Sequence, residues 1–233
     1  MNEYLIAVSE SEGAAAAEQA RVLEARAAYT AQLKKSGAFL DGERLRSSTE
    51  GRRVKSVDGK LQIDEGPFAG TLGSYWAVKA KDLDEAVSLA RQLPLAPGET
   101  VEVRPIMKGE HQPAKTDKPG RVFAFGVLGS APNEEAWIRL MNRIDADTND
   151  RPSESFPDRF IAGLRLEAPR TGRRLVNQHG KTVVLDGPFL ESKEVIGGIF
   201  FMRLASLEDA VAWVSTTPFV GIGSAEVREV WRS

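Results

Sequence analysis

The first candidates for chemistry are the charged residues around a Gly-Pro-Phe turn in the second half of the chain. Asp186 precedes the turn, and "LESKE" behind it supplies Glu191, Lys193 and Glu194. A carboxylate at such a place could act as a general acid or base, or bind a ligand. The alternative is structural, because an aspartate before a turn can accept a backbone N–H and charged loops are commonly solvated. An earlier Gly-Pro-Phe at 66–68 favours the structural role for Asp186.

Glutamate and arginine also alternate with valine near the end of each half, in "EVR" at 102–104 and at 226–228. Successive residues of a strand point to opposite faces, so each Glu and Arg should share the face that the valines leave. These side chains could form interlocking Glu–Arg pairs that set the register of the two halves. They could instead line a cleft for a carboxylate or similar anion, to which bidentate arginine is suited.

Arg44 and Arg165 occupy equivalent places in the two halves and join this set. The candidate ligand-binding residues are therefore Arg44, Arg104, Arg165, Asp186, Glu191, Lys193, Glu226 and Arg228. Among them, Asp186 is the best candidate for catalysis. Any ligand that they recognise should be a small anionic molecule.

Several other chemistries have no support in the sequence. The chain has no cysteine and two histidines, His111 in a predicted linker and His179 at a predicted hairpin tip. No cluster has metal-ligand spacing, and no glycine-rich phosphate loop or dinucleotide fingerprint occurs. We therefore expect neither a metal nor a cofactor.

The composition is that of a globular protein, with 42% hydrophobic and 27% charged residues in 233. A net charge of −2 gives no reason to expect a nucleic-acid or membrane partner. The apolar run at 4–8 is too short for a signal peptide or a membrane span, which predicts a cytoplasmic location. The sequence allows a homo-oligomer.

The sequence also contains an internal repeat. "GRRVKSVDGKLQIDEGPF" (51–68) aligns without a gap on "GRRLVNQHGKTVVLDGPF" (172–189), and "LDEAV" at 83–87 aligns on "LEDAV" at 207–211. Such self-similarity predicts a tandem duplication: repeat 1 over residues 1–108, a linker over 109–120 and repeat 2 over 121–233. Residues 145–158 read as a polar surface loop inside repeat 2.

Each repeat has the pattern of a small α+β domain. In repeat 1 the predicted elements are strand 4–8, helix 14–35 ended by Gly37, strand 39–45, a hairpin of 53–57 and 61–64, strand 75–78, a helix capped by Asp82, and strand 101–106. This order predicts the ferredoxin-like split βαβ plan with an added hairpin. Two helices cover one face of such a sheet. We expect the two repeats to pack through their other faces as an intrachain pseudo-dimeric α+β barrel.

The motifs resemble the YCII-related family, also called DGPF-domain or YciI-like proteins. The resemblance rests on "DGPFLESKEVIGGIF" (186–200), "LEDAVAW" (207–213) and "EVREVW" (226–231), with "EGPF" (65–68) and "VEVRPI" (101–106) in repeat 1. It implies a ferredoxin-like fold that dimerises into an α+β barrel. For the wider group it implies an enzymatic role with a His–Asp acid/base pair, and for some relatives a link to extracytoplasmic-function sigma factors.

The family's histidine position falls near Arg26 here, so a histidine-based mechanism is not expected. Two functions stay open. The first is a small-ligand-binding or regulatory module. The second is a small-molecule enzyme acting on an anionic or cyclic substrate, in which Asp186 or Glu191 moves a proton and Arg165 or Arg228 anchors charge. We favour the first, because no acid/base group tuned toward neutral pH is identifiable, and we expect any single site in repeat 2.

Overall fold

The chain forms two compact units, and each unit takes segments from both repeats. The computed structural model describes residues 1–9, 16–68, 70–112, 120–129, 135, 138–139, 159–178, 181–186 and 195–231. Unit 1 consists of Met1–Arg44, Phe68–Lys108 and Pro169–Phe189; unit 2 consists of Leu45–Pro67, Gly109–Ala168 and Leu190–Ser233. The units are therefore not the same as the repeats, and the repeat boundaries predicted above stay a prediction.

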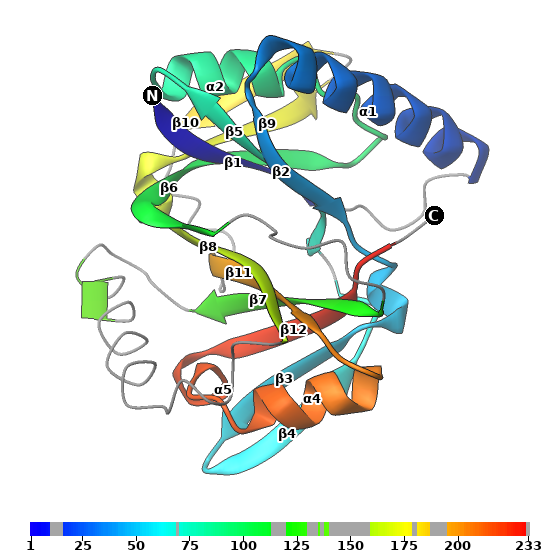
Figure 1. Ribbon diagram of the computed structural model, residues 1–233, viewed down its shortest axis with the longest axis vertical. Coiled ribbons are helices and arrows are strands. Elements are labelled where there is room, and N and C mark those ends of the chain that lie inside the picture. Colours follow the sequence, from blue (N-terminus) through cyan, green and yellow to red (C-terminus); the bar gives the residue numbers. More distant parts are fainter. Residues whose placement is uncertain are drawn as a thin grey trace. The chain divides into compact units, whose positions relative to one another are not determined.

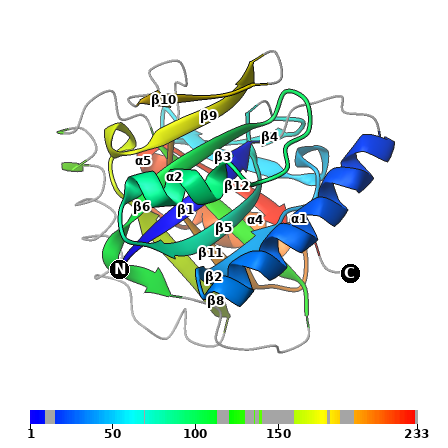
Figure 2. The same ribbon diagram turned by 90° about the horizontal axis from the view of Figure 1, so that it is seen from above.

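Unit 1 is an antiparallel sheet with two helices on one face (Figures 1 and 2). Its elements are β1 (Asn2–Ser9), α1 (Ala16–Ser36), β2 (Phe39–Arg44), β5 (Leu72–Ala80), α2 (Leu83–Ala90), β6 (Thr100–Gln112), the 3₁₀ turn η3 (Pro169–Thr171), β9 (Arg173–Gln178) and β10 (Lys181–Asp186). The strands pair in the order β2-β5-β1-β6-β9-β10. In the first four, β5 lies between β1 and β2, which is the predicted split βαβ arrangement.

The core of unit 1 lies between this sheet and its helices. Val101 and Val103 are buried in one apolar cluster with Leu33 of α1 and Val87 of α2, so these valines face the helices. The other face of the sheet is buried as well, at Leu5, Ala7, Tyr75 and Ala77 among others.

Unit 2 repeats this plan. Its elements are the 3₁₀ turn η1 (Ser48–Glu50), β3 (Arg52–Val57), β4 (Lys60–Glu65), β7 (Val122–Gly129), β8 (Phe160–Leu166), β11 (Val195–Arg203), α4 (Leu207–Ser215), α5 (Phe219–Ile222) and β12 (Ser224–Glu229). The strands pair in the order β8-β11-β7-β12-β3-β4. Phe123, Phe125, Met202 and Val214 are among its buried core residues. The polar loop predicted at 145–158 lies outside the described residues.

The two hairpins are exchanged between the repeats. Hairpin β3–β4 comes from repeat 1 but pairs with β12 of repeat 2, and hairpin β9–β10 comes from repeat 2 but pairs with β6 of repeat 1. The registers are equivalent, because Ala225 lies opposite Val54 and Val101 lies opposite Leu175. Offsets of 124 and 121 residues in the repeat relate these two pairs. The exchange is therefore reciprocal.

Local sequence explains the turns and caps. The β3–β4 turn has Asp58 at φ 51° and Gly59 at φ 74°, the two positive values of a type I′ turn, as Asp-Gly predicts. The Asp82 side chain caps α2 by accepting the Glu85 N–H at 2.9 Å, and Ser206 caps α4 by accepting the Asp209 N–H at 3.0 Å. Gly37 ends α1 at φ 76°.

Strand β6 extends into the predicted linker. Strand β6 runs to Gln112, so the linker's first four residues, including His111, are strand. Residues 113–119 lie outside the described residues. Among the residues that the structure does describe, no helix is both long and apolar enough to cross a membrane.

Candidate functional site

Asp186, the main acid/base candidate, forms a cross-strand ion pair at the base of hairpin β9–β10. Its Cα partner in the register is Arg173, whose Nε lies 2.6 Å from Asp186 Oδ1, and its side chain is 78% exposed. Hairpin β3–β4 has an equivalent cross-strand ion pair, because Glu65 lies opposite Arg52 and its Oε1 is 3.0 Å from Arg52 Nη2. Asp186 thus joins the two strands of its hairpin through a cross-strand ion pair. The turn residues after it lie outside the described residues, so the expected backbone contact and the choice between its structural and catalytic roles stay predictions.

The candidate residues of the "LESKE" segment lie outside the described residues. Glu191, Lys193 and Glu194 follow β10 in residues 187–194, which the structure does not describe, and the hairpin tip with His179 is also outside. Their proposed roles stay predictions. Phe68 of the first Gly-Pro-Phe turn is half-buried.

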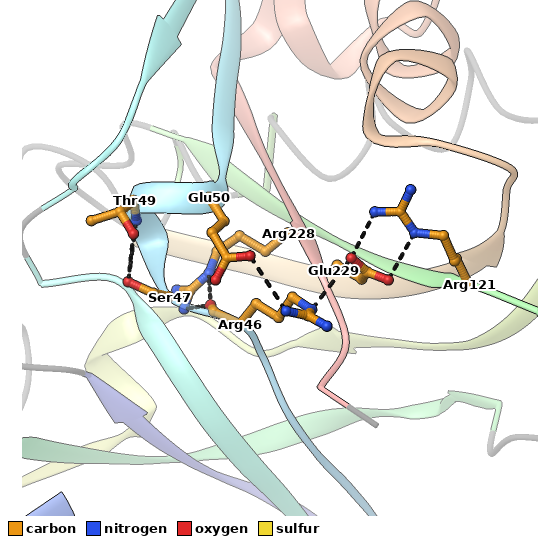
Figure 3. A network of polar contacts seen from close by, with 7 residues as sticks. All are labelled: Arg46, Ser47, Thr49, Glu50, Arg121, Arg228 and Glu229. Carbon is orange, nitrogen blue, oxygen red and sulfur yellow. Dashed lines mark hydrogen bonds and ion pairs between the residues drawn. The ribbon is translucent and has the colours of Figure 1, made fainter. Parts of the chain in front are cut away.

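Arg228 is buried against the segment that leads into the exchanged hairpin (Figure 3). Its Nε donates to the Arg46 carbonyl oxygen at 2.8 Å, its Nη2 donates to the same oxygen, and its Nη1 lies 3.5 Å from Glu226 Oε1. A Cβ on Gly51 would lie 2.9 Å from Arg228 Cγ, so the glycine makes room for the arginine stem. This side chain therefore binds residues 46–51 of repeat 1 to β12 of repeat 2.

A charged network continues from there to the surface. Figure 3 shows Glu229 between Arg46 and Arg121. Arg121 binds it through two hydrogen bonds of 2.9 and 2.8 Å, and Arg46 Nε lies 3.4 Å away. The hydrogen bonds from Arg121 hold the pKa of Glu229 below its usual range, and Glu229 in turn raises the pKa of Arg121.

Arg104 is the counterpart of Arg228 in unit 1. It too is buried, its Nε lies 3.1 Å from Glu102 Oε1, and its burial lowers its pKa. A Cβ on Gly172 would lie 2.9 Å from the Val103 carbonyl oxygen and 3.5 Å from Arg104 Cγ. The buried arginine packed beside a glycine of the other repeat therefore occurs in both units.

Glu226 is paired with an arginine that is not among the predicted candidates. Arg53 lies opposite Glu226 in the β3–β12 register, and its Nη2 is 2.8 Å from Glu226 Oε2. The equivalent position in unit 1 places Arg174 opposite Glu102. The Arg-Arg pairs at 52–53 and 173–174 are too short to predict a basic patch. Their identity in both repeats was the signal that could have drawn attention to them.

Arg44 and Arg165 do not join the other arginines of the predicted set. Directly opposed residues of an antiparallel pair share a face. Arg44 lies opposite Ser74, which lies opposite Val8 on the helix-covered face of unit 1, whereas Arg104 lies opposite Leu5 on the other face. In unit 2, Arg165 correspondingly lies opposite Gly198, and its Nε is 3.5 Å from Glu110 Oε2.

The position expected for the family's histidine holds a structural ion pair. Arg26 of α1 is buried, donates to the Pro94 carbonyl oxygen at 3.0 Å and forms a hydrogen-bonded ion pair with Glu99. Glu99 also accepts the Ala96 N–H at 2.7 Å. This pair fastens α1 to the segment before β6. Within the described ranges, no group of three His, Cys, Asp or Glu side chains could hold a metal ion.

In the described part of the chain, three carboxylates of the sites considered above are paired with arginines. Asp186, Glu226 and Glu102 all have an arginine nitrogen within 3.1 Å. The carboxyl groups whose pKa departs clearly from its usual value, Asp64, Glu208 and Glu229, are all shifted downward by hydrogen bonds. Such groups stay ionised near neutral pH and suit charge pairing better than proton donation.

Comparison with known proteins agrees with the duplication. The model of the YCII-related domain matches the chain twice, at residues 2–110 and 124–233. No curated protein matches. A solved structure described as a candidate chlorite dismutase aligns with 100% of this chain and 96% of its own, at 6% identity and a TM-score of 0.41. With two domain matches that together span nearly all of its length, the chain belongs to the YCII-related domain family and carries the domain twice.

Proposed function

We propose that the protein is a non-catalytic module that binds a small anionic ligand. The observation that carries this proposal is the pairing of Asp186 with Arg173 at 2.6 Å, repeated by Glu65 and Arg52 in the other hairpin. A carboxylate that joins two strands through an arginine has a structural task.

Arg165 is the anchor for the ligand in this proposal. It lies near the end of β8, opposite Gly198 of β11, and β11 begins directly after the predicted charged loop. Gly198 allows the close approach of the two strands, because a Cβ there would lie 2.7 Å from the Leu164 carbonyl oxygen. A guanidinium suits a carboxylate or phosphate because it can present a planar pair of donors, and a ligand here would compete with Glu110, whose Oε2 lies 3.5 Å from Arg165 Nε. Arg44, opposite Ser74, is the equivalent anchor in unit 1.

We further propose that units 1 and 2 form an intrachain pseudo-dimer of the α+β barrel type. The hairpin exchange supports this, because it is reciprocal and in equivalent register, as the two subunits of a symmetric dimer would have it.

A ligand screen tests the binding function. The full chain is heated with small carboxylates and with inorganic phosphate, and the shift in melting temperature is recorded. Arg165→Gln should abolish the shift given by any stabilising anion, whereas Arg121→Gln, which removes an exposed arginine in the Glu229 network, should retain it. Every stabilising anion is then incubated with the protein and followed by NMR. If an anion is turned over and Asp186→Asn abolishes the turnover, the protein is an enzyme and not a non-catalytic module. If no anion in the screen stabilises the protein, the binding proposal is refuted.

A further inference from the structure

Strand β4 is the last strand of the unit 2 sheet among the described strands. It pairs with β3 through six consecutive residue pairs without a bulge, and among the described strands it has no other partner. Natural edge strands are commonly shielded by proline, by a bulge or by a covering segment, because their free N–H and C=O groups can pair with another strand. Between Lys60 and Glu65, β4 has neither a proline nor a bulge, and its three charged residues, Lys60, Asp64 and Glu65, are of both signs.

This edge also carries exposed apolar side chains. Leu61 is 53% exposed and Ile63 is 49% exposed. Ile63 lies opposite Val54 of the unit 2 core. Leu61 and Ile63, two residues apart on β4, therefore both point to the face on which α4 and α5 pack against β3. At the equivalent positions of hairpin β9–β10, Leu61 is replaced by Thr182, which is polar, and Ile63 is replaced by Val184, which packs against the unit 1 core. The exposed pair is thus a property of β4 and not of the duplicated scaffold.

We propose that β4 pairs with β4 of a second copy of this chain, in an antiparallel register centred on Gln62. A twofold axis perpendicular to the sheet requires opposed residues of the two strands to share a face, so residue numbers of a pair must add to an even number. Centred on Gln62, Leu61 lies opposite the partner's Ile63, and Lys60 lies opposite the partner's Asp64. Apolar side chains then meet each other, and unlike charges meet across both ends.

Neighbouring registers are worse. Centring on Ile63 places Leu61 opposite Glu65, and centring on Leu61 places Ile63 opposite Gly59 of the turn. The Gln62 register alone matches apolar with apolar and positive with negative along the strand. The low net charge of −2 adds little long-range repulsion between two copies. One pair of edge strands makes a small interface, so the dimer is reversible and depends on concentration.

Sedimentation velocity of the full chain over a wide concentration range tests the association. We expect the wild type to shift from monomer to dimer as the concentration rises. Ile63→Lys places a charge next to Gln62, the centre of the contact, and should keep the protein monomeric to at least tenfold higher concentration. Thr182→Lys, the matched change on the other hairpin, should behave as the wild type. A wild type that stays monomeric throughout overturns the proposal, as does a dimer that Ile63→Lys leaves intact.

Disulfide trapping tests the register. The chain has no cysteine, so any introduced thiol is unique. In the proposed register Gln62→Cys lies opposite itself, at a Cα separation of about 4.5–5.5 Å that suits a disulfide. Lys60→Cys lies four residues out of register from its copy, about 13 Å away, and should not crosslink. Crosslinking of Lys60→Cys in preference to Gln62→Cys would overturn the register. Melting temperatures equal to that of the wild type exclude unfolding as the cause.

Discussion

Arg228 and Arg104 are buried at equivalent positions of the two repeats, and each packs beside a glycine contributed by the other repeat. A buried guanidinium is costly unless its donors are satisfied. Arg228 meets this need with the Arg46 carbonyl oxygen and Glu226, so the cost of burying the charge is offset by holding an exchanged segment in place. These arginines, first considered as anchors for an anion, have their observed partners inside the protein.

The stability of an Arg228 variant measures this role. Arg228→Leu keeps most of the buried volume but leaves the Arg46 carbonyl oxygen without its donors, and we expect it to lower the free energy of unfolding by about 3 kcal/mol. Urea unfolding gives the value. Arg121→Gln is the control, because this exposed arginine also pairs with a carboxylate and should cost below about 1 kcal/mol. Equal losses in the two variants would contradict the structural role of Arg228.

The Glu229 network predicts a dependence on pH. Hydrogen bonds from Arg121 hold the pKa of Glu229 below its unfolded value, so the folded state binds this proton less readily than the unfolded chain. The contribution to stability is therefore present above the unfolded pKa of about 4.3 and is lost as the pH falls through the lower folded pKa. Glu229→Gln should thus destabilise the protein at pH 7 and much less at pH 3. Urea unfolding at both pH values checks this, and a difference from the wild type that grows toward pH 3 would contradict it.

At the scale of elements, local sequence signals predicted the helices, strands and turns, because caps, Asp-Gly turns and alternation act within a few residues. The exchange of the hairpins was not predictable in this way. Arg53 and Arg174 are equivalent by repeat, so a hairpin folded back on its own repeat would place an arginine opposite the same glutamate. Both pairings satisfy the same local rules. The face of the sheet to which Arg44 points could not be predicted for a related reason, since β2 shifts its register between Phe39 and Asp41.

The exchanged pairing can be measured at its central ion pair. Arg53 and Glu226 are 173 residues apart in sequence and 2.8 Å apart in space, and both side chains are mostly buried. A double-mutant cycle with Arg53→Gln and Glu226→Gln should give a coupling of about 1–2 kcal/mol. Lys55 and Asp64, a more exposed pair within the same hairpin at 3.2 Å, should give below about 1 kcal/mol. A coupling near zero for Arg53 and Glu226 would show that the hairpin does not pair with β12 in this register.

At the scale of the whole molecule, the Gly-Pro-Phe turns mark where the chain changes units. The boundary between units falls at Pro67–Phe68 in the first turn and directly after Phe189 in the second. Gly66 is fixed by close packing, because a Cβ there would lie 1.7 Å from the Ser48 carbonyl oxygen. The repeated motif is thus the point at which each exchanged hairpin returns to the unit formed mainly by its own repeat.

This topology predicts that the repeats stay together when the chain is cut between them. A protease site inserted within residues 113–119 would give two fragments, each lacking a hairpin that the other supplies. Because β12 pairs with β3 and β6 pairs with β9, the cut protein should elute as one species near the 25.4 kDa of the intact chain. It should separate only in urea near the unfolding midpoint, since separation removes two strand pairings and exposes Val54 and Leu175, which are buried in the two cores. Intact protein carrying the same insertion is the control for its effect on folding. Fragments that separate in native buffer would show that each hairpin pairs within its own repeat.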